Sequence, residues 1–166
     1  YNNIAEVYRS QGEYTKAIEY FTKGLKVYKV FYGDELYLDI ATSYHNLGRV
    51  YQNQRKHHRA LDSCLQALEI RESLEDESTP ETADIKYMIG ELFEEQRKYQ
   101  EALEFYFKAL EIWRSINGEN NFDVAKSFHA IGKLYYTVGE SQKSLNCYLK
   151  SLEIQKKIGI DNQAMT

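Results

Sequence analysis

The sequence contains few side chains whose type and spacing could support catalysis or metal binding. His57 and His58 are adjacent, so on a helix they would point about 100° apart and could not share one metal ion. Glu94 and Glu95 are neighbouring carboxylates, which is ordinary for the exposed face of a helix. There is no glycine-rich phosphate loop, no zinc-type cysteine and histidine spacing, and no HExxH motif. We therefore expect no enzymatic activity, no metal site and no cofactor.

Two further pairs of residues carry reactive groups. Cys64 and Cys147 lie among apolar residues in helical segments. We interpret them as reduced core thiols, and the alternative is a reactive thiol. His45 and His129 occupy equivalent positions in two repeats of the pattern described below, which favours a role on a binding face over a metal site.

Composition excludes several classes of partner. The chain has 166 residues, the length of one ordinary domain, and a net charge of −4 with both signs interspersed. It has no basic run that would follow a phosphate backbone and no apolar stretch long enough to span a bilayer. We expect no binding to nucleic acid, no membrane insertion and a cytoplasmic location. Because the chain begins at Tyr1 without a methionine, we expect a fragment of a longer protein.

A pattern of apolar and small residues recurs four times at intervals of 42 or 43 residues. Its first position is occupied by Ile4, Leu47, Ile89 and Ile131. The one extra residue falls between Phe31 and Ile40, in a connection, where an insertion costs little free energy. The repeats span residues 1–37, 38–79, 80–121 and 122–166, and together they form one array over 1–166.

Each repeat contains two segments with helical periodicity. We predict first helices at 1–11, 38–54, 80–96 and 122–138. We predict second helices at 14–31, 57–75, 99–116 and 141–158. Only one proline and nine glycines occur in the chain, which also disfavours a turn-rich β fold.

Local signals mark where these helices start and stop. Thr79 and Pro80 place a proline at a first helical position. Asn121 is a candidate N-cap for the next first helix. Gly12 and Gly139 are typical of the turns between paired helices.

Three glycines lie in the middle of first helices, where glycine costs about 1 kcal/mol relative to alanine. They are Gly48, Gly90 and Gly132. Small residues also occupy the facing positions of the second helices, namely Ala60, Ala102 and Ser144. We expect small residues to meet small residues here, so that the paired helices approach closely.

The repeated residues resemble the signature of the tetratricopeptide repeat family. They are Tyr44, Leu47, Gly48 and Tyr51, followed by Ala60 and Ala67. The usual family period is shorter by about two helical turns, and the long form is similar to the repeats of kinesin light chain. The resemblance implies an all-α solenoid, a right-handed superhelix of four stacked hairpins with the first one truncated. It also implies that first helices line a concave groove.

The predicted groove residues lie opposite the core positions of the first helices. In repeats 1 and 2 they are Asn2, Asn3, Glu6, Arg9, Ser10, Thr42, His45, Asn46, Arg49, Gln52 and Asn53. In repeats 3 and 4 they are Asp84, Tyr87, Met88, Glu91, Glu94, Glu95, Lys126, His129, Lys133, Tyr136 and Thr137. For any single residue, a solvated helix face is the alternative interpretation. For the face as a whole, we expect a site for a protein or extended peptide.

The charges of these residues suggest a polarity for the ligand. Repeat 3 contributes four carboxylates, and Arg49, Lys126 and Lys133 lie in the repeats on either side. The hypothesis is a peptide with a basic residue over repeat 3, so that reversing Glu91 and Glu94 to lysine would weaken binding.

One known binding mode of the family is not supported by the sequence. Some tetratricopeptide domains clamp a terminal carboxylate with cations and an asparagine on successive first helices. Asn46 matches the asparagine, but Asn2, Glu6, Asp84 and Met88 stand where cations are needed.

The alternative function is a structural one, a self-associating scaffold segment of a larger signalling protein. The last helix keeps the internal apolar pattern and has no polar cap, and the chain begins partway through a first helix. We therefore expect that copies could stack end to end.

Overall fold

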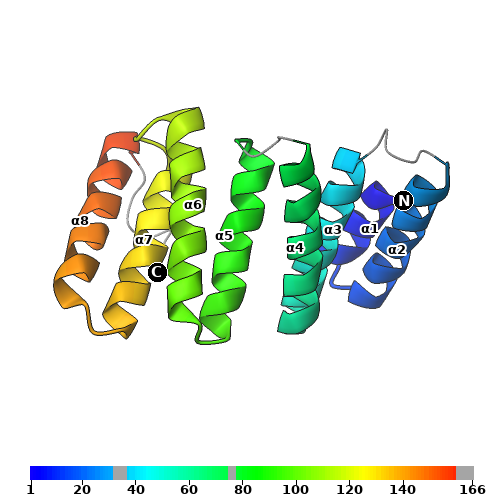
Figure 1. The fold of residues 1–166 in the computed structure, drawn as a ribbon, viewed down its shortest axis with the longest axis horizontal. Helices are drawn as coiled ribbons and strands as arrows, with labels where there is room; N and C mark the ends of the chain where they lie inside the picture. The colour runs from blue at the N-terminus through cyan, green and yellow to red at the C-terminus, as the bar shows by residue number, and fades with distance from the viewer. Residues whose placement is uncertain (32–36, 75–77, 160–166) are drawn as a thin grey trace. The chain divides into compact units, whose positions relative to one another are not determined.

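The computed structural model describes residues 1–31, 37–74 and 78–159. These residues contain eight α-helices and no β-strand, so the predicted all-α solenoid of helical hairpins is confirmed (Figure 1). The helices are α1 (Asn2–Ser10), α2 (Tyr14–Phe31), α3 (Tyr37–Asn53), α4 (His57–Ser73), α5 (Pro80–Glu95), α6 (Tyr99–Asn117), α7 (Phe122–Thr137) and α8 (Ser141–Ile158). Each boundary lies within two residues of its predicted position.

The helices group into two compact units, each made of two hairpins. Unit 1 spans Tyr1–Glu77 and contains α1 to α4, and unit 2 spans Ser78–Thr166 and contains α5 to α8. In unit 1 the hairpins meet through α2 and α3, and in unit 2 through α6 and α7. The extra residue expected between Phe31 and Ile40 falls in a stretch whose residues 32–36 lie outside the described part. A single array over 1–166 stays a prediction.

The two helices of every hairpin are joined by the same turn. One residue in each turn has a left-handed φ, and these residues are Gly12 (76°), Arg55 (56°), Arg97 (60°) and Gly139 (86°). The N–H of the next residue donates to a carbonyl five positions earlier, on Tyr8, Tyr51, Phe93 and Tyr135 respectively. The predicted glycine turns are confirmed, and arginine adopts the same conformation in the two internal hairpins.

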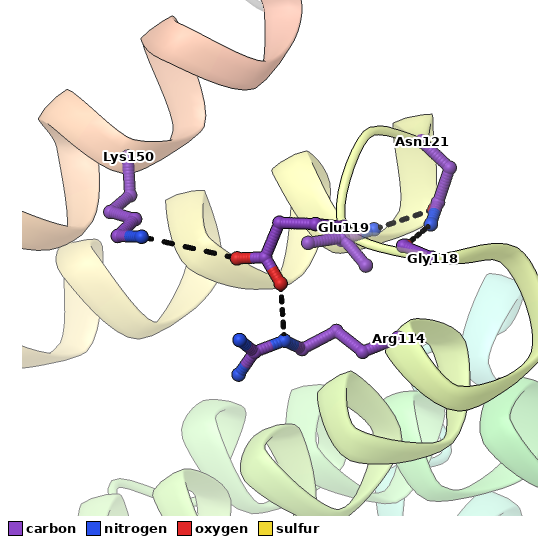
Figure 2. A network of polar contacts seen from close by, with 6 residues as sticks. Arg114, Gly118, Glu119, Asn121 and Lys150 are labelled. Atoms are coloured by element: carbon purple, nitrogen blue, oxygen red, sulfur yellow. Dashed lines mark hydrogen bonds and ion pairs between the residues drawn. The ribbon is translucent and has the colours of Figure 1, made fainter.

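Two first helices begin with side-chain caps, and the sequence predicts the Asn121 cap of α7 and the proline at the start of α5. The Thr79 hydroxyl accepts the N–H of Thr82 at 3.3 Å, and Pro80 follows the cap. The Asn121 carboxamide accepts the N–H of Val124 at 3.0 Å and donates to the Gly118 carbonyl at 2.6 Å (Figure 2). Each cap satisfies an N–H that the first turn of a helix leaves without a partner.

A carboxylate beside the second cap links the second helices of unit 2. Glu119 Oε2 accepts from Arg114 Nε on α6 at 2.7 Å, and Glu119 Oε1 lies 3.9 Å from Lys150 Nζ on α8. Figure 2 shows the carboxylate between the two cations. Because all three side chains are partly exposed, such a pair of contacts contributes little to stability.

Two of the mid-helix glycines allow close packing of the paired helices, and the groups that pack against them are mainly tyrosine rings. A Cβ added to Gly90 would lie 2.8 Å from two ring carbons of Tyr106. At Gly132 the nearest atoms are Tyr148 ring carbons at 3.1 Å and Cys147 Cβ at 3.2 Å. The expectation that these two glycines mainly face the small residues Ala102 and Ser144 is therefore wrong. The tyrosine one turn further along the second helix occupies the space instead.

Both cysteines are free thiols. Cys64 is fully buried, as expected for a core thiol, whereas Cys147 is only partly buried. Burial raises the pKa of Cys147, which keeps the thiol protonated and weakly nucleophilic at neutral pH.

Candidate peptide-binding face

The predicted binding residues lie on the first helices, α1 and α3 in unit 1 and α5 and α7 in unit 2. We call these surfaces the first-helix face of each unit. All of the predicted residues are at least partly exposed, except Tyr87 and Met88. The side chains that reach solvent are mainly polar or charged, as expected for a face that can pair with a peptide backbone.

Tyr87 and Met88 do not project from the first-helix face as expected. Tyr87 is 9% exposed and Met88 is 5% exposed. Every residue from Ile85 to Gly90 is buried, so buried positions surround this part of α5. The prediction assumed one buried stripe per helix, which does not hold for a helix that is covered on several sides.

Tyr87 belongs to an aromatic and cationic stack in unit 2. Its ring centroid lies 4.9 Å from that of Tyr106 on α6, and Lys126 Nζ on α7 lies 4.0 Å from the Tyr87 centroid. This places the ammonium group within the range of a cation–π contact. Burial, followed by nearby carboxylates including Glu91, raises the pKa of Tyr87, so its hydroxyl stays protonated.

Glu94 lies on the first-helix face but is held by two partners within unit 2. Tyr106 Oη donates to Glu94 Oε2 at 2.9 Å, and Lys133 Nζ on α7 lies 2.8 Å from Glu94 Oε1. The hydrogen bond to Glu94 raises the pKa of Lys133. Glu94 therefore ties α5 to α6 and α7. Lys133 thus already pairs with the charge that the ligand hypothesis offers to a basic residue, and that hypothesis stays a prediction.

On unit 1, the residues of α1 interact with their own helix and with α3. Asn2 Nδ2 donates to Ser43 Oγ on α3 at 2.8 Å. Glu6 forms an ion pair with Arg9 at 2.8 Å. Thr42 on α3 donates its hydroxyl hydrogen to the Leu38 carbonyl at 2.8 Å. Asn2 Nδ2, Glu6 Oε2 and the Thr42 hydroxyl therefore have local partners, whereas Asn2 Oδ1 and Glu6 Oε1 are buried without one.

Asn46 and Arg49 on α3 differ from these neighbours. Within the described residues, neither side chain makes a hydrogen bond or an ion pair. Arg49 is exposed and Asn46 is half-buried. Because they are three positions apart on one helix, they lie on the same side of it, one turn from each other. The carboxamide can donate and accept hydrogen bonds, and the guanidinium can bind a carboxylate.

The equivalent histidines have different surroundings in the two units. Burial, followed by the positive charges of Arg49 and Arg71, lowers the pKa of His45 to about 4. His45 is therefore neutral at pH 7. In unit 2 the His129 ring lies 5.3 Å from the ring of Tyr148, centroid to centroid.

The sequence prediction missed contributions from second helices to the first-helix face. Tyr106 reaches Glu94, and Tyr148 contacts His129. A signal existed, because both tyrosines occupy one position of the repeat, four residues after Ala102 and Ser144. The same position holds Cys64 in repeat 2, which the sequence indicates is a core residue, and the phenol oxygen is what distinguishes the two tyrosines from it.

Within residues 1–31, 37–74 and 78–159, no three histidine, cysteine, aspartate or glutamate side chains form a group that could hold a metal ion. None of the helices in this described part combines the length and the apolar character that crossing a membrane requires. A cytoplasmic location stays a prediction.

The sequence matches the model of one protein family along most of its length. Residues 1–73, 39–107 and 81–157 each match the tetratricopeptide repeat model. No curated protein matches the sequence significantly.

Several solved structures share the fold. BtubC (BKLC) from P. vanneervenii has a TM-score of 0.84 and 22% identity, and the match covers 98% of this chain and 63% of that protein. A kinesin light chain-like protein of nearly identical TPR-like repeats from Podosopora anserina has a TM-score of 0.78 and 18% identity, with 94% and 74% covered. Aspartyl phosphate phosphatase F from Bacillus subtilis has a TM-score of 0.81 and 16% identity, with 95% and 40% covered.

These identities are low enough that the structural neighbours establish the fold alone. The family match supports a general role in protein–protein interaction and indicates no enzyme family. The expected likeness to kinesin light chain-type repeats is confirmed. The three family matches leave only the last few residues uncovered, and the chain therefore belongs to the tetratricopeptide repeat family.

Proposed function

We propose that the chain binds an extended peptide or partner segment on its first-helix face, with Asn46 and Arg49 of unit 1 as the principal contacts. The ligand places its backbone against the Asn46 carboxamide and a carboxylate against the Arg49 guanidinium. This mode uses hydrogen bonds and charge, and it involves no bond-making chemistry.

The observation that carries the proposal is a contrast on the first-helix face between polar side chains that have partners and those that have none. Most polar side chains on this face have partners within their own unit, as Asn2 and Glu94 do. Asn46 and Arg49 have none among the described residues, although Asn46 is half-buried. A polar group that is partly desolvated and has no partner gains most from a ligand that pairs with it.

The neighbouring histidine supports the same assignment. Because His45 is neutral at pH 7, it does not repel an arginine one turn away. The exposed guanidinium of Arg49 then selects an acidic ligand residue. Repeat 3 has Met88 and Glu91 at the equivalent positions, so we expect the two units to prefer different ligand residues.

A peptide-library selection against the chain tests this function. We expect enriched peptides to contain an acidic residue and to bind about tenfold more weakly to the Asn46→Ala, Arg49→Ala double variant. The matched control is Asn146→Ala with Arg114→Ala, which removes the same two side-chain types from second helices and should leave affinity unchanged. If selection yields no peptide, or if both double variants bind equally well, the proposal is wrong.

A second candidate function is stacking onto another set of helical repeats. Leu145 on α8 is 51% exposed, whereas Leu103, at the same repeat position on α6, is 7% exposed. On α1, Val7 is 54% exposed, whereas the equivalent Val50 on α3 is fully buried. The two exposed surfaces match the two sides of the joint between α6 and α7, so one copy could pack α8 against α1 of the next.

Sedimentation velocity at several protein concentrations tests this second function. We expect association that increases with concentration and is weakened by Leu145→Glu. The control is Val138→Glu, which changes an exposed apolar residue at a hairpin turn. A monomer at every concentration would exclude stacking between copies of this chain.

A further inference from the structure

The turn between α3 and α4 in unit 1 carries a cluster of positive charge. Arg55 lies in the turn, Lys56 is the N-cap of α4, and Arg59 is the third residue of that helix. The side chains of all three are exposed, as is that of His58, which lies between Lys56 and Arg59 in the sequence. Within residues 1–31, 37–74 and 78–159, none of these three cations forms an ion pair.

The other three hairpins place opposite charges where this hairpin has two cations. The two positions are the residue just before the second helix and the third residue within that helix. They hold Glu13 and Lys16, Lys98 and Glu101, and Glu140 and Lys143. Two of these pairs form ion pairs, with 3.4 Å between Lys143 Nζ and Glu140 Oε2 in the last hairpin. The second hairpin alone has like charges at these positions, on Lys56 and Arg59.

Like charges at these two positions are unfavourable, because residues three apart at the start of a helix lie on the same side of it. The first turn of α4 contains no acidic residue. Asp62, one turn after Arg59, forms no ion pair with it among the described side chains. Arg59 contacts the Tyr51 ring, with its guanidinium carbon 5.8 Å from the ring centroid, and this contact leaves its N–H donors available. A bound anion would relieve this repulsion.

A phosphate monoester matches the cluster better than a carboxylate does. It carries a charge of about −1.5 to −2 at pH 7 and three strong acceptor oxygens, whereas a carboxylate carries a single charge. The two guanidinium groups can each donate two parallel hydrogen bonds to phosphate oxygens, and Lys56 adds an ammonium group. The Cα atoms of Arg55 and Arg59 are at most about 14 Å apart, so these long side chains can converge on one group.

The charge of the whole chain favours a single phosphate over an extended polyanion. The cluster is confined to one turn, and the net charge of the chain is −4. A nucleic acid or an anionic membrane extends beyond the turn and would meet repulsion from the remaining surface. One phosphorylated side chain on a protein contacts the cluster alone.

We infer that the α3–α4 turn binds a phosphorylated serine or threonine of a partner protein through Arg55, Lys56 and Arg59. The turn follows the end of α3 and does not include Asn46 or Arg49. The site therefore goes beyond the proposed function, because it adds a contact that depends on phosphorylation of the partner.

The test is a selection from three degenerate peptide libraries, with phosphoserine, serine or glutamate fixed at the centre. It uses the Asn46→Ala, Arg49→Ala variant, which lacks the proposed contacts of the first-helix face. We expect enrichment from the phosphoserine library only, and saturable amide shifts at Lys56 and His58 when the best peptide is titrated into the 15N-labelled variant. The same peptide with a central glutamate should bind at least about tenfold more weakly.

Three results of this selection would overturn the inference. They are no enrichment from the phosphoserine library, equal affinity for the phosphoserine and glutamate peptides, and shifts confined to other parts of the chain. The wild-type chain should bind the selected phosphopeptide as tightly as the variant does. If it binds about tenfold more tightly, the phosphate lies at Arg49, and the inference fails while the proposed function stands.

A reciprocal exchange of charge makes the test specific. Arg59→Glu gives the second hairpin the opposite charges that the third one has, and it should abolish phosphopeptide binding. Glu101→Arg gives the α5–α6 turn, which already holds Arg97 and Lys98, a third cation, and it should create a second site with new shifts at Lys98 and Gln100. Both substituted residues are exposed, so neither change disturbs the core. Retained binding in Arg59→Glu contradicts the inference.

A matched pair of double variants separates the site from a general effect of charge. Arg55→Gly with Lys56→Gln should weaken the phosphopeptide about tenfold, whereas Arg97→Gly with Lys98→Gln should leave its affinity unchanged. Glycine fits both turns, because the outer hairpins have Gly12 and Gly139 at this position with a left-handed φ. Equal losses in the two double variants would overturn the inference. So would binding of phosphatidylserine vesicles or single-stranded RNA that Arg59→Glu abolishes, if no phosphopeptide is enriched.

Discussion

At the scale of single residues, the tightest packing occurs where the backbone of a helix glycine contacts a tyrosine ring. Gly90 lies against Tyr106, which is 1% exposed and donates its hydroxyl hydrogen to Glu94 at 2.9 Å. Gly132 lies against Tyr148, which is half-buried. The two glycines occupy the same repeat position, yet the rings opposite them differ in how far they can move.

We predict that Gly90→Ala destabilises the protein more than Gly132→Ala. The new methyl group at Gly90 would clash with a ring that is fixed by burial and by Glu94, at a net cost of about 1–3 kcal/mol. At position 132 the ring can yield, and the gain in helix propensity of about 1 kcal/mol offsets the crowding. Urea unfolding of both variants measures the difference. Equal stability of the two variants would contradict this account of the glycines.

Because of His45, we expect the free energy of unfolding to depend on pH under mildly acidic conditions. Its folded-state pKa of about 4 lies below the ordinary value of 6.5, so the unfolded chain binds the proton more readily between these values. Stability should therefore fall as the pH decreases through this window. Protonation of His45 should lower the free energy of unfolding by about 2 kcal/mol between pH 7 and pH 5.

The measurement is unfolding of the wild type and of His45→Gln at pH 7 and pH 5. We expect the wild type to lose more stability than the variant, because glutamine does not titrate. If both proteins lose the same amount of stability, the neutral, half-buried histidine makes no contribution.

At the scale of elements, the four hairpin turns share one backbone conformation, although the residues that form them differ. All four turns share a left-handed residue and the following hydrogen bond to a carbonyl five positions earlier. Glycine adopts this conformation without strain at Gly12 and Gly139, whereas Arg55 and Arg97 bear a steric cost. The packing of the paired helices therefore imposes the turn even where the local sequence disfavours it.

We predict that Arg97→Gly stabilises the protein by about 0.5–1 kcal/mol, because glycine removes the left-handed strain. The matched change, Gly139→Ala, introduces that strain into the equivalent turn and should destabilise the protein by a similar amount. Thermal unfolding monitored by circular dichroism measures both. A decrease in stability with Arg97→Gly would show that the arginine side chain contributes more than its backbone costs.

At the scale of the whole molecule, the division into two compact units suggests that each unit is stabilised mainly by its own contacts. Each hairpin buries its apolar face against its neighbours, so the total is close to a sum of nearest-neighbour terms. A change within one unit should then loosen that unit first.

Hydrogen–deuterium exchange of Gly90→Ala tests this locality. We expect faster exchange in α5 to α8, the helices of unit 2, and unchanged protection in α1 to α4. Uniformly faster exchange in all the described helices would mean that the two units unfold as one.

The sequence by itself determined the helices, the repeat and the family. Periodicity and caps such as Thr79 and Asn121 act within a few residues, so the helix boundaries could be predicted to within two positions. The polar character of the first-helix face was also predictable, because each side of a helix follows from its register.

Only the tertiary structure decided which of these side chains already have partners. The burial of Tyr87 and Met88 and the link from Tyr106 through Glu94 to Lys133 depend on how helices distant in sequence pack together. Register fixes the direction in which a side chain leaves its own helix. The neighbouring helices decide what it contacts there, and this is why Asn46 and Arg49 could be distinguished from paired side chains such as Glu94 only in three dimensions.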